Sequence, residues 1–542
     1  MRQARPMATV LESTHEVLRH LGLTTVFGNP GSTEEPFLRD FPPDFRYVLV
    51  LQEASAVAMA DGYAQATGRP AHVNLHTAPG VGNGMGNVVT AWHNKTPLII
   101  TAGQQTRAML LTEPRLANPR AAELVQPYVK WSHEPTRAQD IPAAVLRAYA
   151  SAVQPPGGPV LLSLPMDDWR QPAGDPTPRR TVSTRVAPEP ERLGEFADVL
   201  RASRNPALVL GGALDRSDGW DAAVALAERL GAAVWCAPAP ERIGFPEDHR
   251  QFHGVLPFAI GPLAERLAGY DTVLVVGAPV FRYYPYVPGD HLPDGTRLLH
   301  ITDDPAEAAR APVGDSIIGD SRLACAALAD LLPPSGRPPP DGRPAPGPPD
   351  PGTPEPGTPL DPDQLFCALG RLWPRDGVLV AETPSNVAVL RRRLPITRPR
   401  SYFATASGGL GFGLPAAVGI ALAERDTGRG RPVVAVIGDG SFHYSVQALW
   451  TAARLQLPLV VLVPVNQQYG ILKAFAAHEG TPGVPGLDLP GLDLLAIARG
   501  YGCAAYPVES ADALAQRLPA ALAAAGPTVL AAPITAGVPA IL

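Results

Sequence analysis

The chain has few charges and no long apolar run. Charged residues make up 18% of its 542 positions, the formal net charge is −6, and no long Lys/Arg cluster occurs. We therefore expect no nucleic-acid partner. The longest apolar stretches, such as 458–465, have the length of a strand. A membrane helix needs roughly 20 such residues, so we expect no transmembrane anchor.

Cysteine is also scarce. The four cysteines lie far apart without Cys-x-x-Cys spacing, which argues against a disulfide framework and against a zinc site: Cys236, Cys325, Cys367 and Cys503. The N-terminal residues 1–7 include two arginines but no apolar core after them, so they do not predict a secretory signal. We expect a cytoplasmic protein.

Proline, in contrast, is abundant and concentrated. In the segment 333–362, 14 of 30 positions are proline, a composition that favours an extended tether between folded units. The chain is too long for one core, and typical domain sizes suggest about three domains. No internal short repeat is evident.

Strand-like apolar runs alternate with helical patterns on the N-terminal side of this tether. They lie at 24–27, 47–51, 72–75, 97–102 and 160–164, and then at 207–210, 233–236, 272–276 and 298–301. This alternation is typical of parallel sheets. The prediction is three doubly wound parallel-sheet α/β domains: a first domain at 1–183, a middle domain at 184–332, the proline-rich linker at 333–362 and a C-terminal domain at 363–542.

A metal-binding pattern occurs in the last domain. An apolar strand ends in Gly438-Asp439-Gly440-Ser441, a helix is expected from about Ser441 to Leu455, and a second apolar strand ends at Asn466. Parallel sheets bind ligands at the carboxyl ends of their strands, and a helix N-terminus there suits phosphate oxygens. Asp and Asn oxygens are ligands for Mg²⁺. Gly-Asp-Gly alone would also fit a tight turn with a solvated Asp.

A carboxylate occupies the corresponding place in the first domain. Glu53 follows the run 47–51 and opens an alanine-rich helix at 54–68. An acid in a first helical turn also has an ordinary explanation, because it complements the helix dipole. Nearby, Ser32 closes the turn-rich segment 26–32, and His76 ends a strand before a flexible glycine-rich loop at 77–84. By themselves, Ser32 fits a turn former and His76 fits a hydrogen-bonded, partly buried histidine.

These segments together resemble the thiamin-diphosphate enzymes, and most closely the benzoylformate decarboxylases. The resemblance extends over nearly the whole chain outside the linker, including 101–108, 277–283, 408–412 and 484–488. It implies an enzyme that uses thiamin diphosphate with Mg²⁺ or Ca²⁺ to release carbon dioxide from an aromatic 2-oxo acid, leaving an aldehyde. It also implies a homotetramer with active sites at dimer interfaces.

The resemblance further implies residue roles. Glu53 would contact the pyrimidine ring, Ser32 the substrate carboxylate, and His76 would relay protons. Asp439, Asn466 and the carbonyl of Gln468 would bind the metal. The remaining expected cofactor contacts are Asn29, Gly408, Leu410, Gly438, Gly440, Ser441 and Tyr469. Leu472 and Phe475 would line the substrate pocket, although an ordinary helix core explains both equally well.

One departure concerns catalysis. Tyr284 stands where the benzoylformate decarboxylases carry a second catalytic histidine. A phenol, with a reference pKa of about 10, exchanges protons at neutral pH less readily than imidazole does. Tyr284 can still donate a hydrogen bond. We expect slower decarboxylation and more carboligation as a result.

Three alternatives stay open. An acetolactate-synthase-like carboligase shares the expected architecture, although the Ser32 and His76 segments favour the decarboxylase. A non-catalytic homologue that kept the cofactor is opposed by Glu53. A nicotinamide-dependent oxidoreductase would need a glycine fingerprint directly after a strand, and 408–413 does not meet that requirement.

Overall fold

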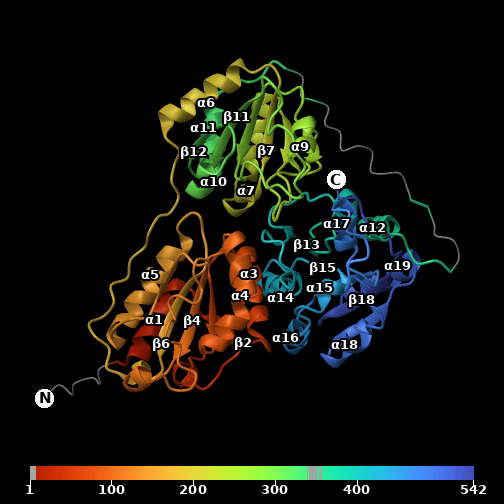
Figure 1. Ribbon diagram of the computed structural model, residues 1–542. Helices are drawn as coiled ribbons and strands as arrows, with labels where there is room; N and C mark the ends of the chain where they lie inside the picture. The colour runs from red at the N-terminus through yellow and green to blue at the C-terminus, as the bar shows by residue number, and fades with distance from the viewer. Residues whose placement is uncertain (1–7, 338–339, 341–350, 353–356, 542) are drawn as a thin grey trace.

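The computed structural model of the protein describes residues 8–337, 340, 351–352 and 357–541 (Figure 1). Within these residues the strands form three six-stranded sheets, each entirely parallel, with helices between most consecutive strands. The predicted fold class, α/β with three doubly wound parallel sheets, is therefore confirmed. Nowhere in the described ranges is a helix both long and apolar enough to cross a bilayer.

The first sheet has the strand order β2-β1-β3-β4-β6-β5. Its strands are β1 (Thr25–Gly28), β2 (Arg46–Leu49), β3 (Ala71–Leu75), β4 (Leu98–Gln104), β5 (Trp131–His133) and β6 (Val160–Pro165). Its helices are α1 (Val10–Leu21), α2 (Glu35–Leu38), α3 (Glu53–Thr67), α4 (Thr77–His93) and α5 (Ile141–Val153), with short 3-10 turns η1 (Arg107–Thr112), η2 (Ala138–Asp140) and η3 (Asp168–Arg170).

The middle sheet has the order β12-β11-β10-β7-β8-β9. Its strands are β7 (Pro206–Leu210), β8 (Ala233–Cys236), β9 (Phe252–Val255), β10 (Thr272–Val276), β11 (Arg297–Thr302) and β12 (Asp315–Ile318). Its helices are α6 (Pro190–Ala202), α7 (Gly212–Arg216), α8 (Trp220–Leu230), α9 (Ile260–Arg266), α10 (Pro305–Ala309) and α11 (Ser321–Leu331). The central strands β7 and β10 are buried at every residue, because helices cover both faces.

The third sheet has the order β14-β13-β15-β16-β18-β17. Its strands are β13 (Val378–Glu382), β14 (Tyr402–Phe403), β15 (Val433–Ile437), β16 (Val460–Val465), β17 (Ala504–Pro507) and β18 (Thr528–Pro533). Its helices are α12 (Pro362–Arg371), α13 (Val387–Arg393), α14 (Gly413–Asp426), α15 (Asp439–Phe442), α16 (Ala448–Arg454), α17 (Gly470–His478), α18 (Leu494–Gly500) and α19 (Ala511–Leu522).

The first and third domains meet through two helices, α3 and α14, which lie side by side at the centre of Figure 1. Glycines allow their backbones to touch. A Cβ atom built on Gly419 of α14 would lie 1.9 Å from the carbonyl oxygen of Met59, and one built on Gly62 of α3 would lie 2.3 Å from that of Ala416. Because α3 begins at Glu53, this crossing fixes the Glu53 end of the first domain relative to the third.

Two local expectations were wrong. The glycine-rich segment 77–84 is not a flexible loop but the first half of helix α4, because its glycines let α4 pack tightly on α3. A Cβ on Gly84, for example, would lie 3.3 Å from Val57 Cγ2. The helix expected from Ser441 to Leu455 is interrupted: the single turn α15 ends at Phe442, and α16 begins only at Ala448.

Most of the predicted linker 333–362 lies outside the described residues. Near its end, the side chain of Leu360 is buried and the Leu360 carbonyl accepts a hydrogen bond from Thr535 N at 2.9 Å. The side chain of Asp361 then caps α12. The last residues of the proline-rich segment thus pack with the third domain.

Candidate active site

Glu53 is the first residue of α3, immediately after strand β2 and the Gln52 cap. Its carboxylate is buried and held by two amides: Oε1 accepts from Asn29 Nδ2 and Oε2 from Asn83 Nδ2, each at 3.1 Å. Asn29, predicted as a cofactor contact, therefore lies against Glu53. Both groups sit at the carboxyl edge of the first sheet, where ligands of such sheets bind.

His76 directly follows β3 at the same edge and precedes α4. Its Nδ1 atom lies 2.7 Å from Glu34 Oε2 and 3.1 Å from Thr33 Oγ1. Glu34 is only 1% exposed, and it also accepts hydrogen bonds from the backbone N–H of Gly31 and of Gly103. A buried carboxylate thus fixes the imidazole orientation and leaves Nε2 as the nitrogen that can face a substrate.

The sequence interpretation missed Glu34. The residue stands in the pair Glu34-Glu35 beside a turn, and only the fold brings it to His76, 42 positions away. The sequence marks Glu34 only as an acid two residues after the predicted Ser32, and nothing at that position indicates a contact with His76. Ser32 itself is exposed and lines an open groove with Pro30, Arg39, Met166 and Arg170.

The third sheet brings the predicted metal ligands together. Asp439 follows β15 and Asn466 follows β16, and these two strands are paired neighbours. The buried Asp439 carboxylate accepts hydrogen bonds from the backbone N–H groups of Gly440, Asn466 and Gln467 at 2.9, 3.1 and 2.7 Å. Burial raises the pKa of Asp439, while these donors act in the opposite direction.

The surrounding loop fits a diphosphate-bound divalent ion. Asp439, Asn466 and the Gln468 carbonyl offer oxygen atoms, the donors that Mg²⁺ and Ca²⁺ prefer. The Gln468 side chain is engaged elsewhere: its Oε1 accepts from Lys473 Nζ at 2.6 Å, and its Nε2 donates to the Gly537 carbonyl at 3.3 Å. No cluster of three or more His, Cys, Asp or Glu residues occurs among the described positions, so any metal here depends on amide, carbonyl or cofactor oxygens.

The remaining predicted cofactor contacts flank this loop. A Cβ on Gly440 would lie 2.5 Å from Tyr469 Cε1, so only glycine leaves room for the ring there. Gly438 is the residue before α15, and Ser441 is buried within that turn. Gly438, Gly440 and Ser441 therefore lie at the carboxyl end of β15.

The loop that carries Gly408 and Leu410 is held by a second residue that the sequence interpretation missed. Glu382, at the end of β13, accepts hydrogen bonds from three consecutive N–H groups, those of Gly411, Phe412 and Gly413, at 2.8, 2.9 and 2.5 Å. Burial raises the pKa of Glu382 to about 7, and the three donors oppose this rise. Gly408 adopts a positive φ of 75°, which favours glycine.

Tyr284 belongs to the middle domain, but its side chain contacts the third domain. Its ring is 62% exposed and contacts Phe475 of α17, with ring centroids 4.8 Å apart. Leu472, one turn earlier on α17, is also exposed, so neither α17 residue is buried as an ordinary helix core would be.

The predicted residues thus form two groups. One is at the first sheet, with Asn29, Ser32, Glu53 and His76. The other is at the third sheet, with Asp439, Asn466, Gln468, Tyr469, Leu472 and Phe475, and it includes Tyr284. Among the described residues, no hydrogen bond or ion pair joins a member of one group to a member of the other.

A three-domain parallel α/β chain with this oxygen-lined loop defines a thiamin-diphosphate enzyme. The family models agree in order: the thiamine pyrophosphate enzyme N-terminal TPP binding domain matches residues 8–121, the central domain 193–328 and the C-terminal TPP binding domain 385–532. The chain belongs to this family.

Within the family, several of the similar proteins are benzoylformate decarboxylases. The enzyme of that name from Pseudomonas aeruginosa is 49% identical over 97% of this chain and 99% of its own. The crystal structure of benzoylformate decarboxylase from Polynucleobacter necessarius matches with 48% identity and a TM-score of 0.96, covering 98% of this chain and 100% of that one. A Rhodococcus jostii thiamine diphosphate-dependent 4-hydroxybenzoylformate decarboxylase matches with 43% identity and a TM-score of 0.92, covering 97% and 99%. In both sequence and structure, the chain is therefore similar to thiamin-diphosphate-dependent decarboxylases of this type.

Proposed function

We propose that the protein converts an aromatic 2-oxo acid such as benzoylformate into carbon dioxide and the corresponding aldehyde. The observation that carries this proposal is the contact between buried Glu34 and partly exposed His76 at the same sheet edge as Glu53. It supplies an oriented imidazole beside the residue expected to contact the cofactor. The relatives that match at 43 to 49% identity carry decarboxylase names, which disfavours the acetolactate-synthase-like alternative.

Bound thiamin diphosphate would accept the electron pair that departing carbon dioxide leaves behind. Asp439, Asn466 and the Gln468 carbonyl would hold Mg²⁺ or Ca²⁺ against its diphosphate. Glu53, fixed by Asn29 and Asn83, would accept or share a proton at a ring nitrogen. Gly408 and Leu410 would shape the space around the cofactor from the loop that Glu382 anchors.

The substrate would meet residues from both groups. Ser32, exposed at its groove, would donate a hydrogen bond to the substrate carboxylate. His76 Nε2 would deliver the proton that replaces carbon dioxide, because Nδ1 is engaged by Glu34. Phe475 and Leu472 would face the aryl group, and the Tyr284 hydroxyl, whose ring contacts Phe475, would donate a hydrogen bond to the substrate.

We also propose that two chains share each active site in a homodimer, with a homotetramer as the full assembly. Apolar side chains stand exposed near both groups, such as Leu51 beside Glu53 and Tyr444 beside the metal loop. Such surfaces are commonly covered in oligomers. The expected location is the cytoplasm, where the four unpaired cysteines would stay reduced.

The first experiment is release of benzaldehyde from benzoylformate with added thiamin diphosphate and Mg²⁺. Glu53→Gln should abolish it while the protein still binds the cofactor. Aldehyde from the wild type separates the enzyme from a non-catalytic homologue, and acetolactate formed from pyruvate instead would favour the carboligase.

A second experiment tests the shared site. Glu53→Gln and Asp439→Ala are each expected to be inactive. A mixture refolded or coexpressed in equal amounts should regain about a quarter of wild-type activity, because half of the dimers are mixed and each has one intact site. An inactive mixture that forms mixed dimers would refute a site shared between chains.

A further inference from the structure

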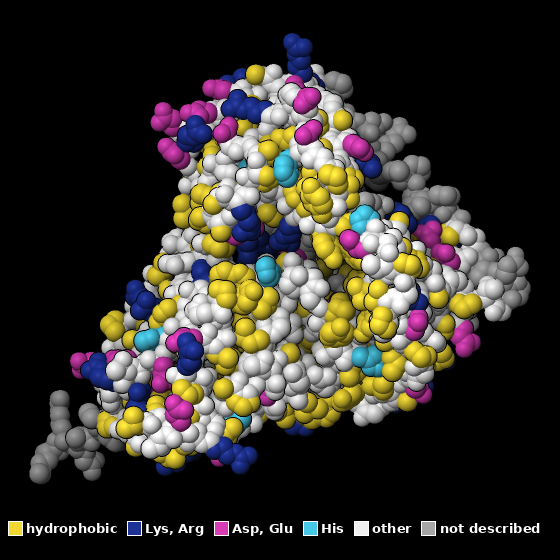
Figure 2. All heavy atoms as spheres, in the orientation of Figure 1, with side chains coloured by type: hydrophobic (Ala, Val, Ile, Leu, Met, Phe, Trp, Pro, Cys, Tyr) yellow, Lys and Arg dark blue, Asp and Glu magenta, His cyan; other side chains and the backbone are white. Residues whose placement is uncertain are grey.

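A charge cluster of buried Glu241 and two partly buried arginines occupies the carboxyl edge of the middle sheet, where the strand order reverses between β7 and β10. Open α/β sheets commonly bind ligands at such a crevice. Here the remaining space is only about 10 Å³, roughly one water molecule, so side chains fill it. On the face shown in Figure 2, Lys and Arg side chains gather in the hollow beneath the middle domain.

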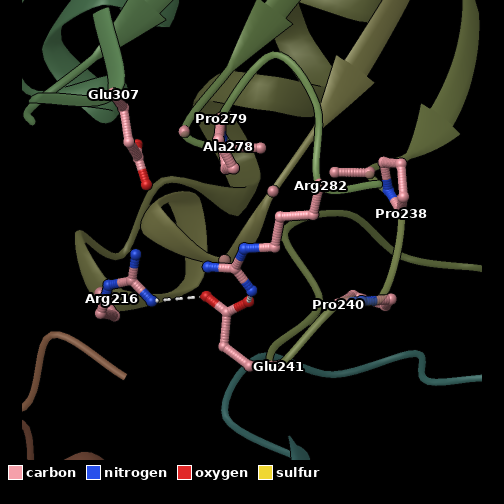
Figure 3. Close-up of a pocket in the computed structure, with 12 residues that line it drawn as sticks. Arg216, Pro238, Pro240, Glu241, Ala278, Pro279, Arg282 and Glu307 are labelled. Carbon is pink, nitrogen blue, oxygen red and sulfur yellow. Dashed lines mark hydrogen bonds and ion pairs between the residues drawn. The ribbon is translucent and has the colours of Figure 1, made fainter. Parts of the chain in front are cut away.

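Glu241 is the centre of this cluster (Figure 3). Its Oε1 accepts from Arg216 Nη1 at 2.9 Å and its Oε2 from Arg282 Nη1 at 3.1 Å. Burial alone would raise the pKa of Glu241, but Arg282 and then Arg216 lower it to about 2. The carboxylate is therefore ionised at any physiological pH and joins the loop after β8 to the loop after β10.

The two loops held by Glu241 lead to the active site. Arg282 stands two residues before Tyr284, whose ring contacts Phe475. On the other side, the backbone carbonyl of Glu241 accepts from Ala404 N at 3.0 Å, four residues before Gly408. One residue thus fixes the segment with Tyr284 relative to the segment that approaches the cofactor.

We propose that Glu241 is a positioning residue that acts through Arg282 to place the Tyr284 hydroxyl over the reacting carbon. This proposal rests on the role of Tyr284 given under the proposed function. Without the carboxylate, the two arginines repel each other and Arg282 loses its anchor, so the loop carrying Tyr284 shifts. A shift near 1 Å is enough to change a rate by about 100-fold.

The test measures the ratio of aldehyde to 2-hydroxyketone formed from benzoylformate, because that ratio reports how fast the proton arrives. Glu241→Gln should lower the ratio by about threefold or more while the protein retains bound cofactor. The matched control is Glu307→Gln. Glu307 lines the same crevice and is also buried, but it pairs with Lys95 Nζ at 2.9 Å on the first domain. Among the described residues it makes no hydrogen bond or ion pair with Glu241 or Arg282. Its loss should lower the melting temperature and leave the ratio unchanged.

A double variant separates positioning from general loosening of the domain. In a Tyr284→Phe background the hydroxyl is absent, so adding Glu241→Gln should leave the ratio where Tyr284→Phe alone sets it. If Glu241→Gln prevents folding, Arg282→Lys keeps the charge but removes the guanidinium, and the same shift is expected. An unchanged ratio in a folded, cofactor-bound Glu241 or Arg282 variant overturns the proposal, as does an undiminished shift in the Tyr284→Phe background. A wild type that releases no aldehyde would instead refute the proposed function.

Discussion

Replacing Gly419 by alanine tests whether the α3–α14 crossing sets the position of Glu53. The new Cβ atom would lie 1.9 Å from the Met59 carbonyl oxygen. Carbon–oxygen contacts need about 3.3 Å, so the helices must separate by roughly 1.4 Å. Overpacking of this kind costs about 1–3 kcal/mol, and the better helix propensity of alanine returns only about 1 kcal/mol.

The expected result is a lower melting temperature and a much larger loss of activity. Glu53 opens the helix that must move, and a misplacement of about 1 Å costs about 100-fold in rate. We would measure kcat for aldehyde release, cofactor retention and thermal unfolding. The matched control is Gly194→Ala in the interior of α6, where a Cβ meets no atom within 4 Å and should stabilise the protein by about 1 kcal/mol. A Gly419→Ala enzyme with wild-type kcat would refute this view of the crossing.

Three further predictions concern buried ionisable groups. Glu34→Gln removes the carboxylate partner of His76, a hydrogen bond worth about 1.5–3 kcal/mol, so kcat/KM should fall roughly 10- to 100-fold. A change below about threefold would contradict the pair's role. Glu382→Gln replaces an acceptor of three N–H groups by a side chain with an NH₂ donor, so thiamin diphosphate should bind at least about tenfold more weakly when measured by calorimetry. The control is Glu424→Gln, because Glu424 is also a buried acid but lies at the far end of α14, and this variant should leave binding unchanged. Burial lowers the pKa of His72 to about 3, so between pH 6.5 and 3 the unfolded chain binds a proton that the native protein excludes. The free energy of unfolding should therefore fall by about 1.4 kcal/mol for each unit by which the pH is lowered through this range. His72→Phe should flatten that part of the stability profile, and an unchanged slope would argue against a buried neutral imidazole.

The central strands could be predicted from the sequence because each is a short apolar run with both faces covered. The predicted run 72–75 lies within β3, and the predicted run 272–276 coincides with β10. Two edge strands gave no such signal: β12 contains Asp315 and Ser316 and is only partly buried, and β14 is two residues long. Their strand conformation depends on the neighbouring strand rather than on their own composition.

The candidate site divides in a similar way. Asp439 and Asn466 could be predicted as a pair because each directly follows an apolar strand, and neighbouring parallel strands end at one edge. Glu34 and Glu382 could not, because their partners are 42 and about 30 positions away and consist of a ring nitrogen and backbone N–H groups. Such partners have no pattern in a single sequence, and only the packed chain identifies these two acids.

The contact between Gln468 Nε2 and the Gly537 carbonyl has a practical consequence for handling the protein. It places Gly537 against the loop that carries the predicted metal ligands. A purification tag fused at the C-terminus would therefore begin only a few residues from that loop, and a histidine-rich tag would add competing imidazoles there. Enzyme intended for cofactor or metal titrations is better produced with its C-terminus unmodified.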